Sequence, residues 1–427
     1  MMVSKVLLLY GYHYGTTGSF IEQSLRRQVQ LCAVGAGHEQ ATEPGWRAGC
    51  ERAATLQEIY QLLPRDFEPE VILVVESGEK FFPDGLQDAP CPCWYYAIDP
   101  HFNGEWQRDY ALLFDRLFVS FKQYLPLFEN VGHPWVRWLP HAYDPHVYYD
   151  HGAPERDIDI AFVGDMDPQT RPQRVMLLQA LQAAGLQTCF TKGIWKEEVA
   201  KLFSRSKLVF NHNHDGVFNP RNFEGSSCGS VVVTNPAENL TDFFTPGENI
   251  LIYEDAPSLV KLVQVVLSQP ERLAQLAAGA AAVVKQHSWD QRMIDLFTMA
   301  QEPAVPIRTH FSQQQQMRAN AMVYQSRGLP GKALSYWRSI AWQVERDFEV
   351  PVRITAIYAQ FGFFPQMLAL LVELLEMPNP PVEALMPLRN FMVEICCEQR
   401  HTRGAELLLE HFTTIAAEQR QKLQALC

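Results

Sequence analysis

The chain has 427 residues, 47% of them hydrophobic and 20% charged, which is typical of an ordinary soluble globular protein with two or three domains. Its formal net charge of −12 argues against a nucleic-acid-binding protein, whose binding face is usually basic. The apolar runs are shorter than the roughly 20 residues of a membrane-spanning helix, and the amino terminus lacks a signal-peptide cleavage site. Nine scattered cysteines suit free thiols in a reducing compartment. We therefore expect a cytoplasmic protein, either free or peripheral to a membrane.

Residues 1–150 alternate short apolar runs with helical patterns, which predicts a doubly wound, Rossmann-like parallel sheet. The unbroken apolar run at 70–77 is typical of a parallel strand that is covered on both faces. The predicted strands are 5–11, 70–77, 93–99, 116–120 and 136–144. The predicted helical or turn-ended segments are 20–35, 56–63 and 124–132.

A polar stretch with Gly and Pro at 150–157 predicts a linker, and a second strand–helix series follows it up to residue 303. The predicted strands are 158–164, 207–213, 229–235 and 249–254. The predicted helices are 171–185, 196–206, 256–269 and 270–287. Two Rossmann-like domains, 1–150 and 151–303, would leave a cleft between them, and ligands of such sheets bind beyond the carboxyl ends of the strands.

Residues 304–427 carry helical patterns only, with an internal repeat of 34 residues, the tetratricopeptide period. A third unit at 393–412 falls out of register, and a plain helical bundle is the alternative interpretation. Repeat arrays expose a groove, so this domain is expected to bind a protein partner. The residues that recur are Tyr324 with Tyr358, Gly328 with Gly362, and Leu334 with Leu368.

The segment 219–235, NPRNFEGSSCGSVVVTN, places charged and small residues directly before a buried strand. A helix that begins near Phe223, with its N-terminus in the cleft, would favour a negatively charged or hydroxyl-rich ligand. Glu224 could accept two hydrogen bonds from the ribose diol, and the Arg221 guanidinium suits a phosphate. The alternatives are a solvated helix-cap acid at Glu224 and an ion pair between Arg221 and Glu224. The pattern favours a nucleotide site.

The same segment, together with 240–255 and 287–293, resembles the C-terminal half of GT-B glycosyltransferases. It is most similar to the spore-coat-maturation (CgeB) type, which is akin to the retaining family 4 enzymes. Residues 115–148 and 158–178 are similar to the same family, and the resemblance covers roughly residues 70 to 300. It implies two Rossmann-like domains followed, in this chain, by the helical-repeat domain.

The resemblance also implies roles for individual residues. Glu224 stands where these enzymes hold the donor ribose, and Arg171 or Arg174 stands where a basic residue contacts the donor diphosphate. Gly15 and Gly18 follow the first strand, where a glycine loop faces the diphosphate or the acceptor. Surface arginines and a bare turn are the alternatives for these positions. The predicted donor-binding residues are Gly15, Gly18, Arg171, Arg174, Asn219, Arg221 and Glu224.

One position departs from the family pattern. Family 4 enzymes often carry a second Glu eight residues before the ribose-binding one, and this chain has Gly216 there. Asp215 is the candidate substitute. Asp99 and His101 end a strand that faces the predicted cleft, so they complete the predicted catalytic set with Asp215. Trp195 either flanks the nucleotide base or packs in the core. No third ligand accompanies the histidines of the segment 211–216, so no metal site is predicted.

The resulting prediction is a glycosyltransferase, EC class 2.4, that moves a hexose from a UDP- or GDP-sugar to a glycan or protein hydroxyl. The resemblance implies retention of configuration and no cofactor or metal, since arginine and a helix N-terminus would neutralise the departing diphosphate. One alternative is a catalytically inactive scaffold that binds partners through its helical repeats. Another is a nucleotide-sugar epimerase, which would convert the free donor without an acceptor.

Overall fold

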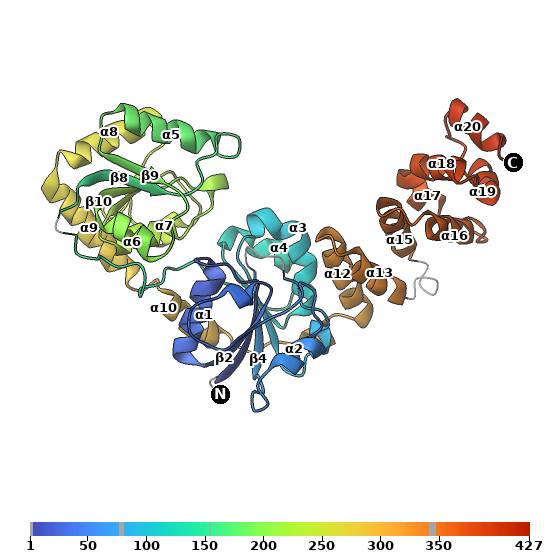
Figure 1. Cartoon of the computed structure of the whole chain (residues 1–427), viewed down its shortest axis with the longest axis horizontal. Helices are drawn as coiled ribbons and strands as arrows, with labels where there is room; N and C mark the ends of the chain where they lie inside the picture. Colours follow the sequence, from blue (N-terminus) through green and yellow to red (C-terminus); the bar gives the residue numbers. More distant parts are fainter. Residues whose placement is uncertain (1–2, 77–80, 154, 341–346) are drawn as a thin grey trace. The chain divides into compact units, whose positions relative to one another are not determined.

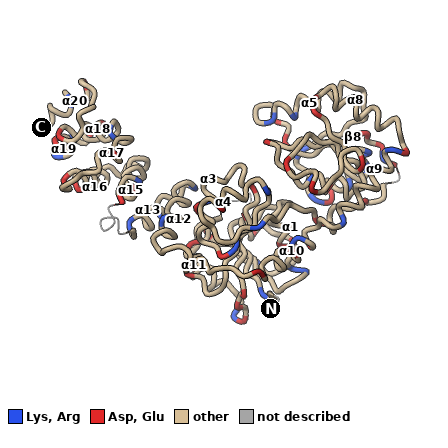
Figure 2. The backbone as a smooth tube through the Cα atoms, turned by 180° about the vertical axis from the view of Figure 1, so that it is seen from behind, with Lys and Arg blue, Asp and Glu red and all other residues tan. Residues whose placement is uncertain are grey.

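The computed structural model describes residues 3–76, 81–153, 155–340 and 347–427, so Ser77 of a predicted strand and Pro154 of the predicted linker lie outside the described residues. The chain divides into two compact units, residues 1–310 and 311–427, and each is described by itself. Figure 1 shows that the first unit carries two separate sheets, each wrapped by helices, and that the second unit is helical. Along both units, Lys and Arg are interspersed with Asp and Glu (Figure 2).

The first sheet has seven parallel strands in the order β3-β2-β1-β4-β5-β6-β7. The strand order reverses at β1, whose residues 6–9 are fully buried because helices cover both faces. The strands are β1 Lys5–Leu9, β2 Gln30–Gly35, β3 Arg47–Gly49, β4 Val71–Val75, β5 Cys93–Ala97, β6 Arg116–Val119 and β7 Val136–Trp138. The main helices are α1 Thr17–Gln28, α2 Leu56–Leu62, α3 Pro100–Tyr110 and α4 Leu125–Glu129.

The prediction of one helical segment over 20–35 is wrong. Helix α1 ends at Gln28, Val29 is extended, and β2 pairs with β1 from Gln30 onwards. The buried residues of β2 continue the amphipathic pattern of α1 in the sequence. Periodicity alone does not distinguish a short buried strand from a helix, so the pattern predicts the two elements as one. The short strand β3 and helix α3 also lie where we predicted no element.

The second sheet has five parallel strands in the order β12-β11-β10-β8-β9, and its order reverses at β8. The loops that follow β8 and β10 therefore meet at the crevice where such sheets bind ligands. The strands are β8 Ile158–Val163, β9 Thr188–Thr191, β10 Ser206–Phe210, β11 Val231–Thr234 and β12 Leu251–Ile252. The main helices are α5 Pro172–Ala183, α6 Glu197–Ser204, α7 Arg221–Ser227, α8 Ala256–Leu267 and α9 Pro270–Val284.

After α9 the chain returns to the first sheet. Helix α10, Trp289–Met299, packs against α1, where Arg27 forms an ion pair with Asp290 at 2.6 Å. One hydrophobic cluster contains core residues of both sheets and of α10. We call residues 3–150 with 289–310 the N-lobe and residues 151–288 the C-lobe. The predicted fold class, two Rossmann-like domains followed by an all-α domain, is confirmed.

The second unit contains helical hairpins with a recurrent turn. Gly328 and Gly362 have φ of 74° and 73° and separate α12 from α13 and α15 from α16. Arg400, with φ 50°, takes the equivalent place between α18 and α19. It lies 38 residues after Gly362, so the third unit is present but shifted by four residues from the 34-residue period. The helices are α12 Gln313–Ser326, α13 Pro330–Ser339, α15 Glu349–Gln360, α16 Phe364–Leu375, α17 Val382–Leu385, α18 Arg389–Glu398, α19 Thr402–His411 and α20 Ala417–Gln424.

None of the helices in the described part of the chain is both long enough and apolar enough to span a bilayer.

Candidate functional site

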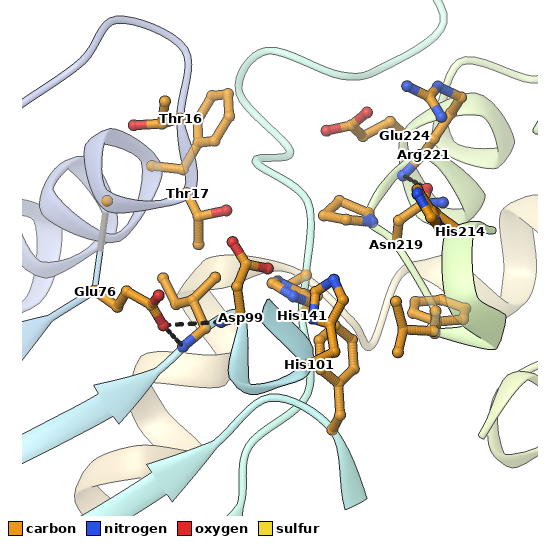
Figure 3. Close-up of a pocket in the computed structure, with 18 of the residues that line it drawn as sticks. Thr16, Thr17, Glu76, Asp99, His101, His141, His214, Asn219, Arg221 and Glu224 are labelled. Atoms are coloured by element: carbon orange, nitrogen blue, oxygen red, sulfur yellow. Dashed lines mark hydrogen bonds between the residues drawn. The ribbon is translucent and has the colours of Figure 1, made fainter. Parts of the chain in front are cut away.

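A cavity of about 480 Å³ lies between the two lobes, at the carboxyl ends of both sheets (Figure 3). The N-lobe contributes the loops after β1, β4 and β5, and the C-lobe contributes the loop after β10 and the starts of α5 and α7. In each sheet, these loops lie at or next to the point where the strand order reverses. The predicted site residues that line the cavity are Gly15, Gly18, Asp99, His101, Arg174, Asn219, Arg221 and Glu224.

A second cavity of about 370 Å³ shares Gly15, Arg221 and Glu224 with the first one. Its remaining wall comes from Tyr148, residues 163–165 at the end of β8, the loop 192–195, and Val199 and Phe203 of α6. Trp195 in this loop is 44% exposed, so it belongs to the cavity wall and not to the core. A Cβ on Gly15 would lie 3.0 Å from the Trp195 ring, and this close approach explains a glycine with φ 71° at that point.

Glu224 lies where the two cavities meet. Figure 3 shows its side chain extending from α7 into the space that faces Thr16 and Thr17 of the glycine loop. Burial raises the pKa of Glu224 to about 7, although the charge of Arg221 and a hydrogen bond from Tyr148 act in the opposite direction. A carboxyl group in this position accepts hydrogen bonds from hydroxyl groups that enter the gap between the lobes.

Arg221 is held by the ends of two strands. Its guanidinium donates to the Val163 carbonyl and to Asn211 Oδ1, both at 2.8 Å, and lies 5.0 Å from the centre of the Phe162 ring. It is thus directed toward β8 and β10, and not toward Glu224. The structure therefore favours an anchored cation in the cavity wall over the alternative of a surface ion pair on one helix face.

Asn219 belongs to a buried amide network beneath the cavity. Its Nδ2 donates to Asn211 and Asn213 at 3.0 and 2.9 Å, and its Oδ1 accepts from the Arg221 amide at 3.1 Å. Asn213 and Thr234 complete the network through a hydrogen bond of 2.9 Å. Because these side chains are satisfied internally, Asn219 fixes the start of α7 and the loop before it.

The two candidate arginines at the start of α5 differ. Arg174 is buried, donates to the Asp165 carbonyl at 3.0 Å and lines the first cavity. Burial, and then the charges of Arg221 and Arg171, lower its pKa to about 10. Its Nε has no hydrogen-bond partner among the residues that the structure describes. Arg171 lies 4.0 Å from Asp165 and is not among the lining residues. The structure thus brings Arg174, and not Arg171, to the cavity.

The N-lobe wall combines carboxyl groups with neutral imidazoles. Burial raises the pKa of Asp99, and burial together with the Asp99 charge raises the pKa of Glu76. Burial lowers the pKa of His101 to about 4 and that of His141 to about 3, so both rings are neutral near pH 7. Glu76 accepts hydrogen bonds at 2.9 Å from the Ile98 and Asp99 amides and orients the start of α3 (Figure 3).

Sequence reasoning missed Glu76, which we included in the strand at 70–77. Its position directly after a buried parallel strand was the available signal, because the carboxyl ends of such strands form the site. Asp215, the third predicted catalytic residue, is 57% exposed, pairs with His214 at 2.9 Å and is not among the lining residues. Within the described ranges, no group of three His, Cys, Asp or Glu residues is arranged to hold a metal ion.

Comparison with known proteins gives both a family model and a fold. Residues 155–298 match the model of a family described as glycosyl transferase-like. No curated protein matches the chain. The solved structures that it resembles have low sequence identity, so they establish the fold alone.

Three of these structures illustrate the match. Sucrose-phosphate synthase from Thermosynechococcus elongatus is 12% identical, with 70% of this chain and 98% of that chain covered and a TM-score of 0.51. Anabaena HepE in complex with UDP and glucose is 13% identical, with coverage of 69% and 99% and a TM-score of 0.51. A glycosyltransferase from Rickettsia africae is 9% identical, with coverage of 70% and 100% and a TM-score of 0.52. The first unit has the GT-B fold, and the predicted resemblance to GT-B glycosyltransferases is confirmed at this level.

Proposed function

We propose that the chain is a glycosyltransferase that moves a sugar from a nucleotide-sugar donor, bound between the lobes, to an acceptor hydroxyl. The observation that carries the proposal is the position of the Glu224 carboxyl at the junction of the two cavities, opposite the glycine loop. The family model over 155–298 and the GT-B fold agree with this proposal. HepE, which shares the fold, has been solved with UDP and glucose.

In this proposal the donor spans both cavities. Its ribose hydroxyls donate to Glu224, and its base enters the second cavity beside Trp195. The diphosphate lies against Arg174 and the loop of Gly15 and Gly18, and the sugar occupies the first cavity. A hydrogen bond between a hydroxyl group and a carboxylate is about twice as strong as a neutral one, so ionised Glu224 is the better ribose acceptor.

The chemistry then divides between the two walls. The bond between the anomeric carbon and the diphosphate oxygen breaks, and the fixed charge of Arg174 stabilises the negative charge that develops on the leaving group. At the N-lobe wall, Asp99 or neutral His101 accepts the proton of the acceptor hydroxyl as its oxygen bonds to the anomeric carbon on the face that the diphosphate leaves. Asp99 suits this role because its raised pKa is closer to the operating pH, which is where a general base is most effective.

The finer features are proposals on the sequence alone. They are membership of the CgeB type, transfer of a hexose, retention of configuration and independence from a metal. They also include UDP or GDP as the donor nucleotide, a glycan or protein acceptor, a cytoplasmic location, and a protein partner on the tetratricopeptide-like unit.

Calorimetric titration tests the proposal. We expect UDP, GDP or ADP to bind the wild type, and E224A to weaken binding at least about 10-fold, because a buried polar contact to the ribose is lost. D242N, which changes a carboxyl on the C-lobe that does not line the cavity, is the matched control and should bind normally. Unchanged affinity in E224A would remove the central residue from the proposal.

A catalytically inactive scaffold is the second candidate. One observation favours it: Gly216 replaces the second acid, and its candidate substitute Asp215 is exposed and outside the cavity lining. Incubation of the full chain with UDP-, GDP- and ADP-sugars separates the two. Release or transfer of sugar supports the enzyme, nucleotide binding without either supports the scaffold, and conversion of the free donor to its epimer would support the epimerase.

A further inference from the structure

Lys196 has an unusual backbone and an unusual side-chain environment. Its φ of 50° and ψ of −117° lie in a region that residues with a Cβ seldom occupy, and it immediately precedes α6. Its side chain is only 7% exposed. Strained conformations of this kind persist where the surroundings enforce them, and they are frequent at ligand-binding sites.

The surroundings that enforce this conformation belong to the other lobe. The Lys196 ammonium forms an ion pair with Glu43, whose side chain is 16% exposed, and lies 4.0 Å from the centre of the Tyr14 ring. Glu43 also accepts a hydrogen bond from the Tyr12 hydroxyl at 2.8 Å. Although burial acts to raise it, the hydrogen bonds from Lys196 and Tyr12 lower the pKa of Glu43, so this group is a carboxylate at neutral pH.

The same contact joins two walls of the second cavity. Lys196 directly follows the loop 192–195, which lines that cavity. The Trp195 ring lies 5.9 Å from the His13 ring and packs on Gly15 of the glycine loop. The ion pair therefore lies next to the point where the C-lobe loop and the glycine loop approach each other.

A second pair between the lobes provides an internal comparison. Lys122 of the N-lobe and Asp242 of the C-lobe are 3.4 Å apart, with side chains that are 51% and 36% exposed. Exposed pairs contribute little because water and salt screen them, whereas removing one partner of a buried pair leaves an uncompensated charge. Lys122 follows Phe121 of the first cavity as Lys196 follows Trp195 of the second, so the two pairs differ chiefly in burial.

We propose that Lys196 is a positioning residue for the nucleotide: Glu43 and Tyr14 hold its ammonium so that Trp195 and Gly15 keep the spacing that the nucleoside requires. This inference rests on the proposed function. It assigns to the pair of Lys196 and Glu43 a role in binding, and the strained backbone at Lys196 is the cost of that role.

The test uses K196M, K196G and E43Q, with K122M as the matched control. UDP is the probe for calorimetry, and GDP and ADP are titrated in parallel. We expect K196M, K196G and E43Q to raise the Kd of the nucleotide by about 10-fold, since small displacements of a binding loop have large effects, and K122M by less than about 2-fold. K196G separates the loss of the ion pair from the backbone strain, because glycine adopts this backbone conformation without strain. Its melting temperature should equal or exceed that of K196M while its affinity is equally reduced.

The outcomes distinguish this inference from the proposed function. If E224A loses nucleotide binding but K196M and K196G keep it, the positioning role is wrong and the proposed function stands. An equal loss in K122M would also contradict the role. If the wild type binds no nucleotide, the proposed function fails, and amide hydrogen exchange of residues 192–204 in the free protein tests the contact by itself. Faster exchange in K196M than in K122M supports it, and equal exchange overturns it.

Discussion

The two walls of the interlobe cavity are built from opposite chemistry. The C-lobe wall presents Arg174 and Arg221, whose guanidinium groups are fixed by carbonyl oxygens at the ends of the strands. The N-lobe wall presents Asp99 and Glu76 with raised pKa values and imidazoles that burial keeps neutral. A donor diphosphate suits the first wall, and an acceptor hydroxyl that must lose a proton suits the second.

The walls also differ in how they are supported. On the C-lobe side, the network of Asn211, Asn213 and Asn219 satisfies its own hydrogen bonds before any ligand arrives. Such an arrangement is preorganised, so little reorganisation is needed when charge develops. On the N-lobe side, a single carboxyl, Glu76, holds the amides of Ile98 and Asp99. Under the proposed function, the C-lobe would therefore fix the donor, while the N-lobe would take up the proton of the acceptor.

The largest effect is expected at the cationic wall. R174M should lower kcat/KM for sugar release by about 100- to 1000-fold, because a fixed charge at the departing diphosphate is removed. R171M changes the residue directly before α5, which is outside the cavity lining, and should change kcat/KM by less than about 3-fold. Calorimetry sharpens the assignment, since R174M should weaken UDP strongly and uridine hardly at all. Equal losses for UDP and uridine would show that Arg174 does not face the phosphates.

The sequence allowed the C-lobe wall to be predicted better than the N-lobe wall, and the reason is chain locality. Asn219, Arg221 and Glu224 come from one short segment, so a motif carries them together. Glu76, Asp99 and His141 come from segments that only the parallel sheet assembles. Polar residues at the end of a predicted strand can be assigned to a common site only after the order of the strands in the sheet is known.

Local context also decided the other differences. Strand β2 follows α1 after a single extended residue, so its apolar run extends the helical pattern without an intervening turn signal. In the second unit, Arg400 adopts the left-handed conformation that Gly328 and Gly362 adopt in the earlier turns. The third hairpin therefore lacks the glycine that marks the other two, and its four-residue shift hides the repeat from a fixed period.

A smaller effect is expected at the N-lobe wall. D99N should lower kcat by about 100-fold, the contribution typical of a general base. Because burial raises the pKa of Asp99, wild-type kcat should fall as pH decreases through a value above the ordinary range of Asp, and D99N should lose this acid limb. E105Q on α3, the helix that directly follows Asp99, changes a side chain that is 94% exposed; it is the control and should keep both the rate and the pH profile. An unchanged pH profile in D99N would contradict the assignment of proton transfer to the N-lobe wall.

The smallest effect concerns the acid on the cationic wall, and its sign follows from linkage. The folded-state pKa of Glu224, about 7, exceeds the value near 4.5 of an unperturbed Glu, so the folded protein binds this proton more tightly than the unfolded chain. Wild-type stability from this group is therefore highest below about pH 4.5, decreases as pH rises to about 7, and stays low above it.

E224Q removes this titration without removing volume. Without nucleotide, it should match the wild type in unfolding free energy near pH 4 and exceed it by roughly 2 kcal/mol at pH 8. Only the wild type then keeps a charge at this half-buried position, and solvent screens part of the roughly 3 kcal/mol linked to the change in pKa. Saturating nucleotide should reduce this difference at pH 8, since a ligand that binds the native state stabilises more strongly the variant that binds it better. Denaturant unfolding at the two pH values, with and without UDP, measures all four differences. Equal stabilities at both pH values would mean that Glu224 is well hydrated, and that the C-lobe wall does not prepare a desolvated carboxylate for the ribose.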